Sequence, residues 1–102
     1  MNIKIFLADD HTVLRDSLRF LLDAQPDFQV VGVAANGRDA VRQVAALCPD
    51  VAILDIAMPE KSGVAVYRAL KENDRLKSIP VIIITGISDD FKQFISRRRQ
   101  VP

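Results

Sequence analysis

Several features that would narrow the function of a protein are scarce in this 102-residue sequence. Its one cysteine, Cys48, has no second cysteine to pair with and no other metal-binding side chain at ligand spacing, which excludes an internal disulfide and a cysteine-based metal site. No apolar run approaches membrane-spanning length, and no export signal precedes the first expected strand. We therefore expect a cytoplasmic protein that does not associate with a membrane.

An excess of charge of either sign is also missing. Lys and Arg total 14 and Asp and Glu total 13, a net charge of +1. This balance supplies neither the basic field that recruits nucleic acid nor an acidic tail, so we expect no direct binding to nucleic acid. The length fits one domain, and 49% hydrophobic residues suffice for a core.

Three short apolar runs each end in, or are directly followed by, residues that can serve in a functional site. The run Val51–Asp55 is rich in β-branched residues and ends in a carboxylate, which is typical of a strand buried on both faces. A run of the same kind over residues 3–8 is followed by Asp9 and Asp10, and a third over residues 81–84 is followed by Thr85 and Gly86. These runs predict strands whose carboxyl ends carry functional groups.

Helical patterns alternate with the strands. We expect strands over residues 3–8, 28–34, 51–55 and 81–84, and helices over residues 12–25, 38–48 and 64–72, with a further helix starting at residues 88–90. This alternation predicts an α/β fold with right-handed crossovers and a parallel sheet. Residues 73–78 are expected to form a polar connection.

The helical spacing of apolar residues also predicts which side chains are buried. The expected inward-facing residues are Leu14, Leu18, Leu21 and Leu22, then Ala40, Val41, Val44, Ala45 and Cys48, and then Val66, Tyr67 and Leu70. His11 stands at a helix start, where a lone histidine is more often a cap or a surface residue than a metal ligand.

In a parallel sheet, ligands lie outside the carboxyl ends of the strands, so three carboxylates are expected to meet there and to require a cation. A hard divalent ion prefers oxygen ligands, and we expect Asp10 and Asp55 to bind it directly and Asp9 through water. A carboxylate can also accept a phosphoryl group as an acyl phosphate, with Thr85 bonding a phosphoryl oxygen and Gly86 leaving room for it. The alternative is that the acids only cap the first helix and a loop.

The combined pattern resembles a response-regulator receiver domain of two-component signalling, of the chemotaxis-regulator type. The residues that carry the resemblance are Asp9-Asp10, Asp55, Met58-Pro59, Gly63 and Thr85-Gly86. The stretch from Ala8 to Arg15 is most similar to receivers joined to helix-turn-helix transcription factors. The resemblance implies a flavodoxin-like, doubly wound sheet with strand order 2-1-3-4.

The resemblance also implies the roles of individual residues. Asp55 would be the phosphoacceptor, and Mg²⁺ would be held by Asp10, Asp55 and the main-chain carbonyl of Ala57, with Asp9 helping through water. Thr85 would be the switch hydroxyl, and Gly86 and Ala57 would line the phosphoryl pocket. The donor would be a phosphohistidine on a sensor histidine kinase. The domain would catalyse its own phosphorylation and dephosphorylation rather than turn over a separate substrate.

The C-terminal part departs from this pattern. Receivers carry a lysine in a fifth strand, and this chain ends at Pro102 before any such strand. We therefore expect residues 1–102 to be a C-terminally incomplete receiver with the fifth strand and helix missing, and any DNA-binding or other output domain to lie outside the chain. The strand over residues 81–84 would then be an exposed edge, which predicts a homodimer or a domain-swapped oligomer.

Three other functions compete with a phosphorylated switch. A phosphatase with an aspartyl-phosphate intermediate would need a second acid two residues after the nucleophile, where this chain has Ala57. A nucleotide-binding module would need a glycine-rich loop after the first strand, where this chain has acids. A receiver-like module that acts only through protein contacts and is never phosphorylated remains open, because the lysine is absent.

Overall fold

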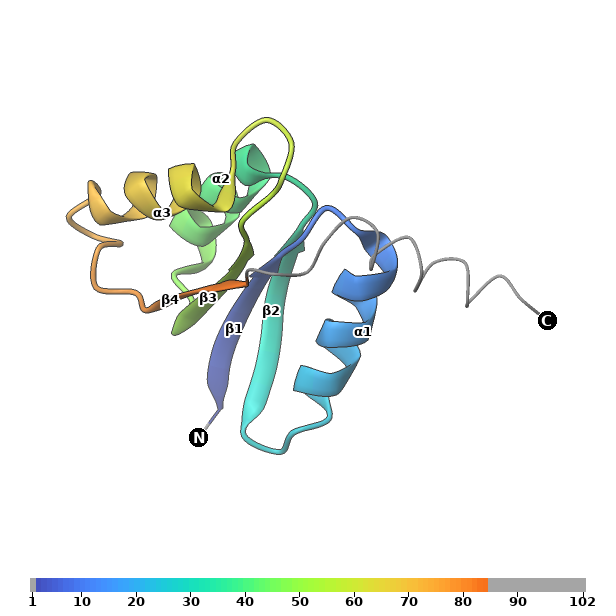
Figure 1. The fold of residues 1–102 in the computed structure, drawn as a ribbon. Helices are drawn as coiled ribbons and strands as arrows, with labels where there is room; N and C mark the ends of the chain where they lie inside the picture. The colour runs from blue at the N-terminus through green and yellow to red at the C-terminus, as the bar shows by residue number, and fades with distance from the viewer. Residues whose placement is uncertain (1, 85–102) are drawn as a thin grey trace.

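A computed structural model of the protein describes residues 2–84, which form a four-stranded parallel sheet and three helices (Figure 1). The strands are β1 (Ile3–Ala8), β2 (Phe28–Ala34), β3 (Val51–Asp55) and β4 (Val81–Ile84), and the helices are α1 (Thr12–Asp23), α2 (Gly37–Leu47) and α3 (Gly63–Lys71). The sheet order is β2-β1-β3-β4, which confirms the predicted α/β fold and its strand order. The helix expected to start at residues 88–90 lies outside the described residues.

The core lies mainly on one face of the sheet. Figure 1 shows α1 on one side of the sheet and α2 with α3 on the other. Alternate residues of β1 and β3, among them Phe6 and Leu54, are fully buried against Val44 of α2 and Val66 of α3. The parallel register places Ala8 beside Leu54, so β1 and β3 end at the same edge of the sheet. The two loops that follow these strands therefore emerge together.

Each helix starts at a side chain that accepts a hydrogen bond from the first turn. His11 Nδ1 accepts from the amide of Leu14 at 3.2 Å, Asn36 Oδ1 from Asp39 at 2.8 Å, and Ser62 Oγ from Ala65 at 3.2 Å. His11 is thus a capping residue, as predicted. The caps set where α1 and α3 begin, and therefore how long the loops after β1 and β3 are.

Three of the predicted buried side chains are exposed, which corrects the sequence-based assignment. Leu21 is 59% exposed on α1 and Tyr67 is 39% exposed on α3. Cys48 is exposed because α2 ends at Leu47, and Cys48 adopts a left-handed backbone conformation (φ 46°) that turns the chain toward β3. Fewer helix residues are therefore buried than the apolar spacing predicts, because the described sheet covers only part of each helix.

The connection between α3 and β4 contributes to the core, although its sequence is mostly polar. Leu76 is 1% exposed and Ile79 is 8% exposed, and both belong to the main apolar cluster. The Lys71 ammonium donates to the main-chain oxygens of Lys77 (2.9 Å) and Ile79 (3.1 Å), which ties the connection to the end of α3. The connection that the sequence predicted is therefore present, and its apolar residue Leu76 belongs to the core.

Candidate functional site

Three carboxylates meet at the carboxyl edge of the sheet, as the sequence predicted. Asp9 and Asp10 follow β1, and Asp55 is the last residue of β3. One carboxylate oxygen from each lies within 4.8 Å of the others. Asp9 (0% exposed) and Asp55 (2% exposed) are buried, whereas Asp10 is exposed. The group is therefore open to solvent on the side of Asp10.

Main-chain amides orient the two buried carboxylates. Asp9 Oδ1 accepts a hydrogen bond from the amide of His11 at 2.8 Å, and Asp55 Oδ1 accepts one from the amide of Ala57 at 3.4 Å. These bonds agree with the alternative in which the acids organise their own loops. They engage one oxygen of each carboxylate, and the convergence of Asp10 on the same point is not required for capping, because His11 itself caps α1.

The loop after β1 is fixed by a residue whose role the sequence did not reveal. Nη1 of Arg15 on α1 donates a hydrogen bond to the main-chain oxygen of Asp9 at 3.0 Å. The amide of Asp9 donates to Ala34 at the end of β2, at 3.0 Å. The apolar spacing of α1 gives Arg15 no role beyond that of a polar residue between Leu14 and Leu18. Its position, about one helical turn after the acidic pair, is the signal that would have identified it.

The loop between β3 and α3, residues 56–62, forms the other wall of the site. It begins with the amide of Ile56 donating to Ile84 of β4 at 3.2 Å, and Gly63 closes it by donating to the oxygen of Ile56 at 3.0 Å. Ala57, two residues after Asp55, is exposed on this loop. The predicted magnesium and phosphoryl-pocket position at Ala57 thus lies beside the acids. Thr85 and Gly86 lie outside the described residues.

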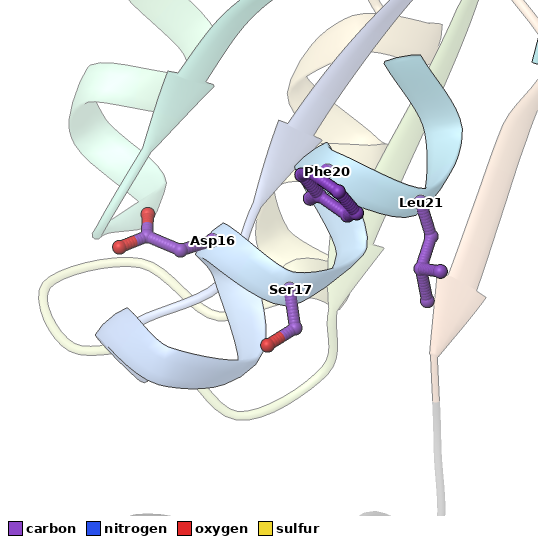
Figure 2. Close-up of a pocket in the computed structure, with 4 residues that line it drawn as sticks. All are labelled: Asp16, Ser17, Phe20 and Leu21. Carbon is purple, nitrogen blue, oxygen red and sulfur yellow. The ribbon is translucent and has the colours of Figure 1, made fainter. Parts of the chain in front are cut away.

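A surface depression on α1 lies away from this site. It has a volume of about 440 Å³ and is lined by Asp16, Ser17, Phe20 and Leu21, all from α1 (Figure 2). Its mouth is mostly apolar and includes none of the three converging carboxylates. We assign the chemistry to the acidic group, because carboxylates and not an apolar depression provide ligands for a cation.

The donor set fits a hard divalent cation. Three carboxylate oxygens within 4.8 Å of one another are the ligand type that Mg²⁺ takes, usually with one or two direct carboxylates and several waters. Two of these carboxylates are buried, and a bound cation would offset the cost of keeping their negative charges close together. The residues present therefore suit Mg²⁺.

Comparison with known proteins gives one consistent family. The model of the response regulator receiver domain family matches residues 5–97. The chain is 39% identical over 88 residues to the DNA-binding transcriptional activator DevR/DosR of Mycobacterium tuberculosis, covering 86% of this chain and 40% of that protein. It is 38% identical over 87 residues to a protein-glutamate methylesterase/protein-glutamine glutaminase of Nocardioides sp., covering 85% of this chain and 23% of that protein.

The solved structures agree with the sequence comparison. The response regulator domain of Thermotoga maritima CheB superposes with a TM-score of 0.74 at 27% identity, covering 98% of this chain and 92% of that chain. With 40% and 23% of their lengths covered, the chain spans less than half of each of the two curated relatives. These two proteins differ in their named activities. Within residues 2–84, no helix is long and apolar enough to cross a membrane.

Proposed function

Because this chain belongs to the response regulator receiver family, we propose that it is a switch in which Asp55 accepts a phosphoryl group from the phosphohistidine of a sensor histidine kinase. The observation that carries the proposal is the convergence of Asp9, Asp10 and Asp55 at the carboxyl edge of the sheet. Asp55 is the choice for phosphoacceptor because it ends the central strand β3 and is held by the amide of Ala57.

In this proposal a carboxylate oxygen of Asp55 forms a bond to phosphorus while the bond between phosphorus and the donor nitrogen breaks, giving an acyl phosphate. Asp10 and Asp55, with the main-chain oxygen of Ala57, would hold Mg²⁺, and Asp9 would assist through water. When bound, Mg²⁺ would offset the charge that the carboxylates and the incoming phosphoryl group bring together. The amide of Ala57 keeps the Asp55 carboxylate in one orientation.

The conformational readout would involve the segment after β4. Ile84 pairs with Asp55, so the chain leaves β4 beside the acceptor. Thr85, as the switch hydroxyl, and Gly86, in the phosphoryl pocket, stay predictions. A new charge and new hydrogen bonds at this edge would shift that segment and so signal to an output domain or partner. Two curated relatives are named as a transcriptional activator and a methylesterase, so the output would differ among proteins that share this domain.

The wider role follows from the same proposal. The domain would act in the cytoplasm and catalyse only its own phosphorylation and dephosphorylation. Its partner would be a sensor histidine kinase. The small net charge of +1 favours a protein partner over direct contact with nucleic acid.

Intact mass spectrometry after incubation with a small phosphodonor and Mg²⁺ tests the proposal. We expect one phosphoryl adduct that requires Mg²⁺, disappears in Asp55→Asn and persists in Asp74→Asn, a control at an acid whose side chain is 97% exposed. An adduct that survives in Asp55→Asn would refute Asp55 as the acceptor. No adduct on the unmodified chain would favour the alternative, a receiver-like module that acts through protein contacts alone.

A further inference from the structure

The start of α2 is in close contact with the loop that follows the proposed phosphoacceptor. Gly37, the first residue of α2, is buried, and its amide points to the main-chain oxygen of Pro59 at 3.4 Å. A Cβ added at Gly37 would overlap the main-chain oxygen of Lys61 and lie 2.5 Å from the Lys61 Cβ. A backbone atom cannot yield as the end of a side chain can, so any residue larger than glycine must push the loop away.

The contacted part of the loop is itself tight. The amide of Lys61 donates to the oxygen of Pro59 at 2.7 Å across Glu60, whose φ of 67° places it in a three-residue turn that is rare for a non-glycine residue. The bond from Gly63 to Ile56 closes the loop at its base. A Cβ at Gly63 would overlap the main-chain oxygen of Asp55, so the far end of the loop packs directly against the end of β3.

We propose that Gly37 is a positioning residue for the magnesium side of the site, because its missing side chain lets α2 hold residues 59–61 and thereby fixes Ala57 beside Asp55. This inference rests on the proposed function, since it assigns Gly37 a role toward the same cation. The role is steric and not conformational: Gly37 has helical backbone, where alanine is the better helix former. Gly37→Ala should therefore favour α2 while displacing the loop.

Calorimetric titration with Mg²⁺ separates these effects. We expect Gly37→Ala to bind Mg²⁺ about tenfold more weakly than the unmodified chain, in the range seen when residues that support metal ligands are changed. Gly32→Ala is the matched control: its new Cβ would meet the Leu47 side chain at 2.7 Å, not the backbone of this loop. We expect it to bind Mg²⁺ with unchanged affinity. Titrating at a temperature where every variant is folded keeps a loss of stability from changing the affinity.

A second measurement needs no substitution and covers the case in which Gly37→Ala does not fold. If α2 and the loop move as one unit, Mg²⁺ should slow hydrogen exchange at the Gly37 and Lys61 amides, while the amide of Phe28, bonded to Gln25 away from the site, keeps its rate. Slowing at Lys61 without Gly37, or an unchanged affinity in folded Gly37→Ala, would overturn the inference alone. Failure of the unmodified chain to bind Mg²⁺ would overturn the proposed function and this inference with it.

Discussion

Arg15 of α1 holds the main-chain oxygen of Asp9, with 3.0 Å between Nη1 of the guanidinium and that oxygen. Asp9 is the first residue after β1, so this bond fixes the course of the loop that carries both Asp9 and Asp10. The guanidinium also brings a positive charge close to a group of three carboxylates. Helix α1 therefore positions the loop that carries Asp9 and Asp10, without contributing a ligand itself.

Arg15→Ala should lower the stability of the fold. A hydrogen bond from a charged donor contributes about 1.5–3 kcal/mol, but Nε of Arg15 is buried with no hydrogen-bond partner among residues 2–84, which offsets part of it. We expect a net loss of about 1 kcal/mol in the free energy of unfolding, measured by urea denaturation. Arg19→Ala is the control on the same helix, where an exposed pair with Asp23 at 3.9 Å should contribute little. Equal stability of the two variants would argue against the anchor.

Asp10→Asn should have opposite effects with and without Mg²⁺. Without the ion, it removes one of three negative charges that lie within 4.8 Å of one another, so the melting temperature should rise. With the ion, it removes a proposed ligand, so the increase in melting temperature that Mg²⁺ gives the unmodified chain should largely disappear. Thermal scans at several Mg²⁺ concentrations test both effects. Asp16→Asn, at an exposed acid outside the group, should keep the full Mg²⁺ response.

The carboxylate group was predictable because local pattern determines it. Asp9, Asp10 and Asp55 each directly follow or end an apolar run, and the carboxyl ends of parallel strands meet at one edge. Neither fact requires knowledge of side-chain packing. The contact between Gly37 and Lys61 was not predictable in this way, since it joins residues 24 positions apart through backbone atoms that leave no hydrophobic pattern.

Burial was harder to predict wherever a single residue departs from its surroundings. Leu76 is an isolated apolar residue in a polar segment, so no period marks it, yet it is 1% exposed. Leu21 and Tyr67 continue helical stripes and are exposed, because periodicity gives the direction of a side chain and not the extent of the surface that covers it.

Leu76→Ala should therefore be strongly destabilising despite its position in a loop. The side chain belongs to the main apolar cluster, and removing a buried leucine usually costs about 2–5 kcal/mol through lost burial and the cavity left behind. Leu47→Ala, at a leucine that is 41% exposed at the end of α2, is the matched control and should cost much less. Urea denaturation of the two variants gives the comparison, and a similar loss in both would contradict the assignment of Leu76 to the core.

The exposed position of Ile82 on β4 leads to a prediction about self-association of the chain. Among residues 2–84, β4 pairs with β3 only, and Ile82 on β4 is 54% exposed. An apolar strand with an unpaired side tends to pair with another chain, so we expect a homodimer or a swapped oligomer in size-exclusion chromatography with light scattering. Ile82→Lys should shift the population toward monomer, because a charge on an edge strand opposes such pairing. Val64→Lys, at a valine on α3 that is 38% exposed, adds the same charge away from β4 and should leave the distribution unchanged. A monomeric unmodified chain, or equal dissociation by both lysines, would show that the β4 edge does not drive association.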